Sequence, residues 1–450
     1  CKALELFPKE HELVFYKACI LDELGQYEDA IIYYDRAIAL DPEDATSYNN
    51  KAYLLNRLKR YNEALDNAQQ AIKLASNNAH AYKNKGEALL GLQLYEDSLA
   101  ACEEALTIYP YLVDAYVIKM KLFAAVNQYD NALNTFRNAM DLGLKDTRLY
   151  YEKGNVLYLN ERYEEAVYAC DQALELDENN QEACYCKGLC YYYQDNYDQA
   201  VHCFDQVIEK DERYEQAYYY KALCLSEDGK REEALIEIEK AIQLDSEHVD
   251  RSHKLKGSIL FNLERYWEAV EAFKKAIEKN PTCASYYYNV GYTLNDRLEE
   301  YEQSLSYFDK SIELDPSVIG AYICKSHSYY NLSEYEKCIE QCDIALELDP
   351  EVLNGHRNRA WAFYELGQLE EAEKSCNRGL KIDGNFENLL GLKLNILRRK
   401  EQYRDALIAA DRYLEICPDD MDIMKIREEL IQKIDKPKKG LFNLLSGKSG

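Results

Sequence analysis

The chain has 450 residues, of which 47% are hydrophobic and 30% are charged, so it is too long for one ordinary hydrophobic core and we expect several domains or one elongated array. The formal charge of −27 argues against an extended nucleic-acid surface, because phosphate backbones are held by clustered Lys and Arg side chains. No apolar run approaches the ~18 residues that indicate a membrane span.

The chain opens with the segment CKALELFPKE, which reads as the end of an amphipathic helix followed by a proline-containing turn. We therefore expect residues 1–10 to be the end of a truncated structural unit, with part of the protein preceding Cys1. No targeting signal can be read at this end, because the true N-terminus is not visible.

A period of 34 residues runs from His11 to Asp420 and predicts twelve units. One residue in the second half of each unit marks the period, at Ala30, Ala64, Ser98, Ala132, Ala166, Ala200, Ala234, Ala269, Ser304, Cys338, Ala372 and Ala406. Single-residue insertions near Val249 and in the segment DRLEEY shift the phase without ending it. Seven of the eight prolines fall near the end of a unit, where they interrupt helices. Each unit therefore predicts two amphipathic helices of roughly 12–14 residues joined by short turns.

This pattern resembles the tetratricopeptide repeat (TPR) family. The shared features are a small residue in the first helix, as at Ala18 and Gly86, a tyrosine at the mid-unit turn, an alanine in the second helix and a closing Asp-Pro. The resemblance implies an all-α fold, an α-solenoid in which antiparallel helix pairs stack into a right-handed superhelix. The expected organisation is 1–10 as the end of a truncated preceding repeat, 11–248 as TPR repeats 1–7, 249–420 as TPR repeats 8–12, 421–435 as a capping helix and 436–450 as a flexible basic tail.

The segment CYCKGLCYYY, from Cys184 to Tyr193, raises the question of a metal or redox site. The fifteen cysteines are scattered along the chain without a C-x-x-C pair, and within this segment Cys186 and Cys190 share a helix face while Cys184 does not. A zinc site takes four protein ligands, or three and a water, so we interpret the thiols as small buried packing residues and expect no metal and no cofactor. A thiol-based metal or redox sensor is the alternative. Scattered free thiols fit a reducing compartment, so we expect a cytoplasmic protein.

A lysine recurs at the seventh position of nearly every unit, and such a ladder would suit phosphate or acidic peptides. Its members are Lys17, Lys51, Lys85, Lys119, Lys153, Lys187, Lys221, Lys256, Lys325 and Lys393, with Arg359 and Val290 as replacements. A helical wheel places the seventh position nearly opposite the residues that line the groove in the TPR family. We therefore expect the stems to pack between helices and the ammonium groups to face nearby Asp and Glu side chains.

The first helices line a concave groove in the TPR family, and in this chain their groove positions carry aromatic and amide side chains. The candidate peptide-binding residues are Tyr151, Asn155, Tyr185, Tyr192, Tyr219, Tyr220, Lys254, Tyr288, Asn289, Tyr292 and Trp361. Aromatic rings supply contact area at low entropic cost, and amides bond to an extended backbone. We therefore expect a protein or peptide partner along the groove, although 41 tyrosines mean that some groove tyrosines reflect composition alone.

The clamp that some TPR proteins use for chaperone C-terminal carboxylates is incomplete here. Lys254 and Asn289 match its pattern, but Ser258, Gly320 and Cys324 stand where Asn, Lys and Arg are required. We therefore expect no binding of that type.

Catalytic patterns are missing from the sequence. No histidine falls in an H-E-x-x-H segment, and there is no glycine-rich phosphate loop. We therefore expect a non-enzymatic scaffold or adaptor that binds neither nucleic acid nor a membrane interior. The alternative is that the array is the regulatory or substrate-recruiting arm of a larger enzyme whose catalytic domain lies upstream of Cys1.

Overall fold

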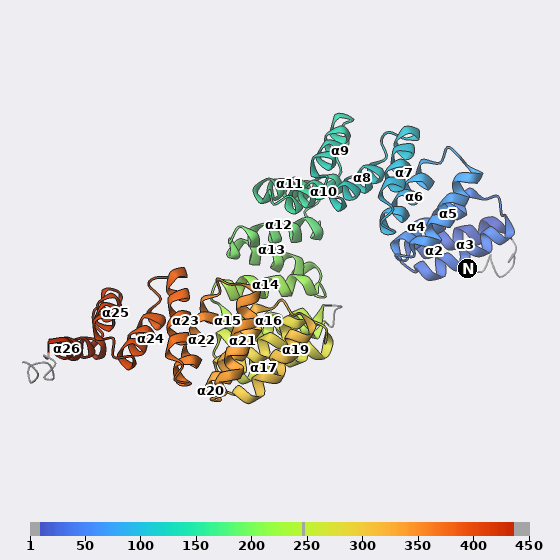
Figure 1. The fold of residues 1–450 in the computed structure, drawn as a ribbon. Helices are drawn as coiled ribbons and strands as arrows, with labels where there is room; N and C mark the ends of the chain where they lie inside the picture. The colour runs from blue at the N-terminus through green and yellow to red at the C-terminus, as the bar shows by residue number, and fades with distance from the viewer. Residues whose placement is uncertain (1–9, 245–247, 436–450) are drawn as a thin grey trace, which may run out of the picture. The chain divides into compact units, whose positions relative to one another are not determined.

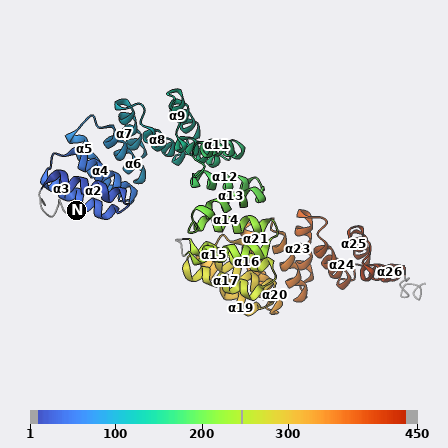
Figure 2. The ribbon, with the colours of Figure 1, turned by 180° about the vertical axis from the view of Figure 1, so that it is seen from behind.

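The structure is a computed structural model that describes residues 10–244 and 248–435. The described residues form α-helices joined by short turns, with no β-strand. Figures 1 and 2 show that successive helices lie side by side as antiparallel pairs. The helices of the described residues, α2 to α26, correspond in chain order to twelve repeats of two helices followed by the single helix α26, so the all-α solenoid predicted from the 34-residue period is confirmed.

Contacts between residues divide the chain into two compact units, Cys1–Gly229 and Lys230–Gly450. The helices of the first unit are α2 (His11–Glu23), α3 (Tyr27–Leu40), α4 (Ala45–Arg57), α5 (Tyr61–Leu74), α6 (Ala79–Gly91), α7 (Tyr95–Ile108), α8 (Val113–Ala125), α9 (Tyr129–Asp141), α10 (Thr147–Leu159), α11 (Tyr163–Leu176), α12 (Gln181–Tyr193), α13 (Tyr197–Lys210) and α14 (Glu215–Glu227). Those of the second unit are α15 (Arg231–Gln243), α16 (Val249–Asn262), α17 (Tyr266–Lys279), α18 (Ala284–Asp296), α19 (Tyr301–Leu314), α20 (Ile319–Asn331), α21 (Tyr335–Leu348), α22 (Leu353–Glu365), α23 (Leu369–Ile382), α24 (Glu387–Arg399), α25 (Tyr403–Ile416) and α26 (Met421–Asp435).

The helices form where the sequence supplies an apolar stripe and a start signal. In α11, residues Ala166, Ala169, Cys170 and Ala173 are buried, and their spacing of three, one and three places them on one side of a helix. At the start of α12, the Asn180 side chain accepts a hydrogen bond from the backbone N–H of Ala183 at 2.8 Å, as an N-cap residue does. Each pair therefore has one side available for stacking on its neighbours.

Small residues allow the two helices of a pair to approach closely. A Cβ atom added to Gly257 of α16 would lie 2.5 Å from the Phe273 ring of α17, which is closer than van der Waals contact permits. A Cβ atom added to Gly188 of α12 would likewise lie too close to the Phe204 ring of α13. These contacts explain why small residues recur in the first helix of the repeat.

The helix α26 covers the end of the second unit. Leu430 of α26 is buried in a cluster with Leu394 and Leu397 of α24 and Ala410 of α25. The expected basic tail, 436–450, and nearly all of the expected partial repeat, 1–10, lie outside the described residues. None of the described helices combines the length and apolar content needed to cross a bilayer.

Candidate functional site

Within each unit, the first helices of successive repeats form one continuous face. Direct contacts join α4 to α6, α6 to α8, α8 to α10, α10 to α12 and α12 to α14 in the first unit, and α18 to α20, α20 to α22 and α22 to α24 in the second. Second helices of successive repeats have no comparable contacts in the described parts of the chain. The first helices are therefore the more closely spaced set, and they line the inner side of the stack. We call this surface the first-helix face.

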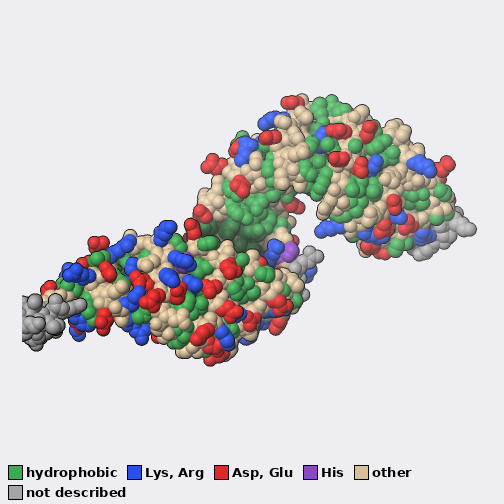
Figure 3. All heavy atoms as spheres, viewed as in Figure 1, with side chains coloured by type: hydrophobic (Ala, Val, Ile, Leu, Met, Phe, Trp, Pro, Cys, Tyr) green, Lys and Arg blue, Asp and Glu red, His purple; other side chains and the backbone are tan. Residues whose placement is uncertain are grey.

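In the first unit, the first-helix face carries a set of tyrosines whose rings contact one another. Tyr220 of α14 lies 6.0 Å from both Tyr185 and Tyr192 of α12, measured between ring centroids, and 5.4 Å from Tyr219. Figure 3 shows hydrophobic side chains gathered over α12 and its neighbours. We call Tyr185, Tyr192, Tyr219 and Tyr220 the tyrosine cluster, and all four were predicted from the sequence as binding residues.

The side chains of the tyrosine cluster are half-buried. Burial raises the pKa of the Tyr185 hydroxyl, and it raises the pKa of Tyr192 to about 12. Edge-to-face and tilted ring contacts hold the side chains in place. The cluster therefore presents aromatic surface together with hydroxyl groups that donate and accept hydrogen bonds, which suits a peptide better than it suits catalysis.

The predicted residues Tyr151 and Asn155 lie on α10 beside a buried carboxylate. Glu152 is 1% exposed, and its Oε1 accepts a hydrogen bond from Asn155 Nδ2 at 3.1 Å. Its Oε2 is buried and has no hydrogen-bond partner, and burial raises the pKa of the carboxyl although Lys121 lies near enough to lower it. Sequence reasoning missed Glu152, yet it is the one charged residue at the sixth position of any of the twelve units.

In the second unit, the predicted residues Tyr288, Asn289 and Tyr292 line one cavity of about 280 Å³ with residues of α16. The Tyr288 and Tyr292 rings stack at 6.0 Å, and Tyr292 lies 5.9 Å from Phe261. The other two predicted residues of this unit lie apart from this cavity. Lys254 is exposed on α16, and Trp361 contacts Tyr364 on α22 at 5.9 Å.

The recurring lysines behave as predicted from the helical wheel. Six of the ten form ion pairs with an acidic residue of the second helix of the preceding repeat: Lys51–Asp35, Lys119–Glu103, Lys187–Asp171, Lys221–Asp205, Lys256–Glu239 and Lys325–Asp309, with N–O distances of 2.5–2.9 Å. Arg359 makes the same pair with Asp343 at 2.6 Å. At Lys153 the corresponding residue is Arg137, and burial lowers the pKa of Lys153. These cations therefore join neighbouring repeats.

The cysteines of the CYCKGLCYYY segment are buried, as predicted. Cys184, Cys186 and Cys190 are all buried, and Cys184 Sγ donates a hydrogen bond to the Cys203 carbonyl at 3.3 Å. The neighbouring Cys186 thiol raises the pKa of the Cys190 thiol most, and burial raises it further. In the described ranges, no three His, Cys, Asp or Glu side chains converge as a bound metal ion would require.

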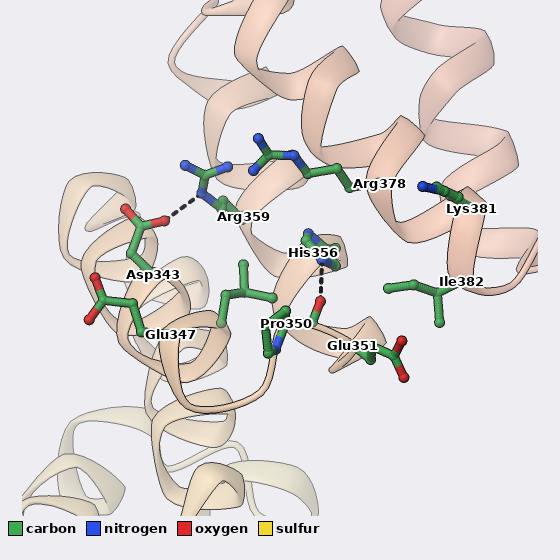
Figure 4. Close-up of a pocket in the computed structure, with 10 residues that line it drawn as sticks. Asp343, Glu347, Pro350, Glu351, His356, Arg359, Arg378, Lys381 and Ile382 are labelled. Carbon is green, nitrogen blue, oxygen red and sulfur yellow. Dashed lines mark hydrogen bonds and ion pairs between the residues drawn. The ribbon is translucent and has the colours of Figure 1, made fainter.

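A second pocket lies away from the tyrosines, between α21, α22 and α23, with a volume of about 820 Å³. Figure 4 shows Arg359 and Arg378 side by side above His356, whose Nε2 donates to the Pro350 carbonyl at 3.0 Å. Carboxylates such as Glu347 line the opposite wall. A pocket of about 610 Å³ occurs at the same place in the repeat between α11, α12 and α13. The gap is thus a recurring feature of stacked repeats rather than a site peculiar to one of them.

Comparison with family models matches most of the chain to one class of repeat. Models described as tetratricopeptide repeat match residues 2–45, 15–79, 49–112, 187–248, 251–283, 284–318 and 325–385. Residues 125–207 match a model described as anaphase-promoting complex, cyclosome, subunit 3. No curated protein matches the chain in sequence.

Solved structures similar to this chain are also repeat proteins or their complexes. The APC/C hetero-tetramer Cut9–Hcn1 is 14% identical, with 96% of this chain and 92% of that chain covered and a TM-score of 0.45. Yeast Tom70 is 15% identical, with 97% and 99% covered and a TM-score of 0.40. The C-terminal part of a TPR repeat-containing protein from Cytophaga hutchinsonii is 17% identical, with 54% and 98% covered and a TM-score of 0.47.

Proposed function

Because this chain belongs to the tetratricopeptide repeat family, whose models match more than half of its length, we propose that it is a scaffold or adaptor that binds a segment of a partner protein on its first-helix face. The observation that carries the proposal is the tyrosine cluster, in which Tyr185, Tyr192, Tyr219 and Tyr220 form a continuous set of ring contacts across α12 and α14. Aromatic side chains of this kind dominate the energetics of protein interfaces.

The nature of the face favours a peptide over a small molecule or a nucleic acid. The net charge of −27 repels phosphate backbones, and the tyrosines lie along successive helices rather than around a closed cavity. An amphipathic helix or an extended segment fits such a surface. The cavity beside Tyr288 and Tyr292 supplies a second contact region in the second unit.

A non-enzymatic role is part of this proposal. The predicted residues of the first-helix face are mostly tyrosines and amides, and burial raises rather than lowers the pKa of Tyr185, Tyr192 and Tyr288, so these hydroxyls are not activated as nucleophiles. The second candidate is a TPR arm that recruits substrates or regulates an enzyme whose catalytic domain lies upstream of Cys1. Both roles use the same face, so the first experiment addresses the face.

We expect photo-crosslinking to locate the partner on the first-helix face. The photoreactive residue p-benzoylphenylalanine replaces Tyr219 in one variant and Tyr292 in another, since its side chain is also aromatic and both positions are only half-buried. The control replaces Tyr168, which lies on the second helix α11 and is 63% exposed. The proteins are irradiated in source lysate, and crosslinked products are identified by mass spectrometry.

A partner crosslinked from Tyr219 or Tyr292 and not from Tyr168 would support the proposal. Binding of that partner should fall at least tenfold when both Tyr185 and Tyr219 are changed to alanine, because two buried aromatic contacts are lost. Circular dichroism checks that the double variant keeps its helix content. The same products from all three positions would contradict the assignment of the first-helix face.

A further inference from the structure

The pocket between α21, α22 and α23 and the equivalent gap between α11, α12 and α13 have different linings. Both contain the recurring cation of the seventh position, which is Arg359 in the first and Lys187 in the second. Three other lining positions differ in chemistry, with His356 in place of Cys184, Arg378 in place of Gln206 and Lys381 in place of Glu209. The gap is common to stacked repeats, whereas its side chains here add two cations and a histidine.

Lys381 reverses the charge that its position usually carries. The equivalent residue is a glutamate in six other repeats, at Glu175, Glu209, Glu278, Glu313, Glu347 and Glu415. Arg378 lies three residues earlier on α23, so the two cations share one side of that helix, and both line the pocket. One wall of the pocket is therefore cationic, although the chain as a whole has a charge of −27.

His356 makes a hydrogen bond that tyrosines make elsewhere and adds a second polar atom. In two other repeats the tyrosine hydroxyl at this position donates to the carbonyl six residues earlier, from Tyr116 to Pro110 and from Tyr287 to Pro281, each at 3.1 Å. His356 Nε2 donates to Pro350 in the same way. The side chain is 5% exposed, and its other nitrogen, Nδ1, is buried without a hydrogen-bond partner. A buried polar atom left unpaired costs free energy, so Nδ1 is a site where a ligand atom gains a partner.

The cationic groups converge on the side of the His356 ring that faces away from Pro350. Figure 4 shows the guanidinium groups of Arg359 and Arg378 side by side there. Burial lowers the pKa of His356 more than the bond to Pro350 raises it, and the two guanidinium groups lower it further. The ring is therefore neutral at pH 7, with its proton on Nε2 and a lone pair on Nδ1.

The carboxylates of the pocket leave this cationic side accessible. Asp343 pairs with Arg359 at 2.6 Å. Glu347 and Glu351 are exposed, and Figure 4 shows their carboxylates at opposite edges of the pocket, away from Arg378. Water and salt screen exposed charges of this kind, so they do not prevent an anion from binding beside Arg378.

The histidine with two neighbouring cations occurs a second time, around His253. Its Nδ1 is also buried without a partner, and Lys256 and Lys275 occupy the positions of the two arginines. That cavity is smaller, about 320 Å³, and Glu278 stands there in place of Lys381. The larger pocket is thus the more cationic of the two.

We propose that the pocket between α21, α22 and α23 binds a phosphate monoester, whose phosphoryl group is held by Arg359, Arg378 and His356. Arginine meets phosphoryl oxygens through paired hydrogen bonds, and Lys381 adds a further positive charge. The second proton of a phosphoryl group has a pKa of about 6, close to that of histidine. One proton is therefore shared between Nδ1 and a phosphoryl oxygen, which a carboxylate with its lower pKa does not match.

The size and apolar part of the lining favour an ester over a bare phosphate ion. The volume of about 820 Å³ is that of a site for an organic ligand. Leu346, Pro350 and Ile382 line the same pocket and supply apolar contacts for the organic group. The inference does not depend on the proposed function, because it uses none of the residues assigned to the binding of a partner segment.

Saturation-transfer NMR with phenyl phosphate as the probe measures binding through the protons of the phenyl ring. Benzoate and phenyl sulfate carry the same ring with a different anion and serve as comparison ligands. We expect phenyl phosphate to bind at least about tenfold more tightly than either, because a second negative charge and a shared proton are available only in the phosphoryl group.

Substitutions that the repeat itself suggests separate a binding role from a structural one. Arg378→Gln installs the residue of the α11–α13 gap, and we expect about a tenfold loss of affinity as a charge-assisted contact disappears. The matched control, Arg412→Gln, makes the same change at the equivalent position of α25 and should leave the affinity unchanged. His356→Tyr keeps a donor for Pro350 and removes Nδ1, so affinity should fall about threefold or more with a thermal midpoint unchanged within about 2 °C.

The site is overturned if phenyl phosphate shows no saturation transfer at millimolar concentration, or if Arg378→Gln binds it as tightly as the wild-type chain or Arg412→Gln does. Benzoate that binds as tightly as phenyl phosphate would overturn the preference for a phosphoryl group. Full affinity in His356→Tyr would overturn the role of Nδ1. A loss in Arg378→Gln and His356→Tyr, with Arg412→Gln unchanged, supports the proposal.

Competition against phenyl phosphate then identifies the source of the phosphoryl group. The competitors are inorganic phosphate, glucose 6-phosphate and a tripeptide with a central phosphoserine. Stronger displacement by the peptide would assign the site to a phosphorylated protein, and stronger displacement by the sugar phosphate would assign it to a small metabolite. Displacement by inorganic phosphate as strong as by either ester would overturn the choice of a monoester.

Discussion

Glu152 and Arg357 are ionisable residues on the first-helix face, the first buried and the second half-buried. They respond to this loss of hydration in different ways. The Glu152 carboxyl is almost fully buried with one oxygen unpartnered, and it can take up a proton when its pKa rises. An arginine keeps its proton in proteins, so Arg357 stays charged, and its Nε donates a hydrogen bond to Asn358 Oδ1 at 3.0 Å. Glu152 can thus relieve its burial by protonation, whereas Arg357 cannot lose its charge.

The buried carboxyl predicts a pH-dependent stability. Burial raises the pKa of Glu152 above its ordinary value of 4.5, so between 4.5 and the folded-state pKa the folded chain holds more protons than the unfolded chain. The free energy of unfolding therefore falls as pH rises through this window, and the contribution is fully present below pH 4.5. We expect Glu152→Gln to stabilise α10 by about 1–2 kcal/mol at pH 8 and to have little effect near pH 4.5.

Amide hydrogen exchange in α10 is the measurement for this prediction, because it reports local opening of the helix. The control is Glu182→Gln, an exposed residue of α12, which should change nothing at either pH. An equal effect of Glu152→Gln at pH 8 and pH 4.5 would show that shape, and not protonation, determines the change.

Sequence reasoning succeeded for residues whose role depends on helix geometry alone. The lysines of the seventh position were placed between helices by the wheel, and their ion pairs follow from that placement. Glu152 and Arg357 were not recognised as special, because burial and the absence of a partner depend on which side chains a neighbouring repeat supplies. Arg357 stands among tyrosines and asparagines at the groove positions, and the sequence does not show whether an acidic side chain pairs with it.

At the scale of the element, the turn between the two helices of a repeat has one conformational requirement. Each of the twelve mid-repeat turns contains a residue with positive φ, which is glycine at Gly25, Gly229 and Gly367 and a side-chain-bearing residue at the other nine. At the end of α10, Glu161 has a φ of 58°, and Arg162 N–H bonds to the Leu157 carbonyl at 2.9 Å. This is the helix-ending geometry that favours glycine.

We expect Glu161→Gly to stabilise the chain by about 0.5–1 kcal/mol, because the relief of left-handed strain exceeds the extra entropy of glycine in the unfolded state. The reverse change, Gly25→Ala, should destabilise the chain by a similar amount. Nothing lies within 4 Å of the added Cβ, so only the positive φ of the backbone opposes the alanine. Urea unfolding midpoints measure both changes. A loss of stability in Glu161→Gly would mean that the glutamate side chain contributes more than its backbone costs.

The period predicted the pairs and their turns, and it also located an irregular turn. The extra residue in DRLEEY lies between Asp296 of α18 and Tyr301 of α19, where the turn has four residues in place of the usual three. The positive-φ residues were not predicted, because only three of the twelve are glycines. All twelve turns require a positive φ at this position, but the type of residue that adopts it differs from turn to turn.

At the scale of the whole molecule, each repeat contacts its immediate neighbours, and stability is close to a sum of local terms. This explains why a one-dimensional pattern in the sequence was sufficient to predict twelve pairs. It also explains why the pattern did not mark the division at Gly229 and Lys230, which falls inside the seventh repeat. The period continues unchanged across that point, so the repeat pattern alone contains no sign of the boundary.

Local stacking predicts that the loss of α26 will affect the end of the second unit and leave the first unit unchanged. Leu430 is 2% exposed and covers Leu394 and Leu397, and burial of each large apolar side chain contributes about 1.5–3 kcal/mol. A chain ending at Asp420 exposes these leucines to water. We expect amide exchange in α24 and α25 to accelerate at least tenfold, with exchange in α2–α7 unaltered.

The matched control ends at Asp435, so that it keeps α26 and removes only the residues that follow it. Leu430→Asp tests the same contact in a full-length chain, because a carboxylate in place of the buried leucine weakens the packing of α26 without removing any residues. If α24 and α25 kept their protection in both variants, the last pair would be stable on its own neighbours alone and α26 would not act as a cap. If protection were also lost in α2–α7, the two units would unfold together, and the description of this molecule as a series of locally stabilised repeats would be wrong.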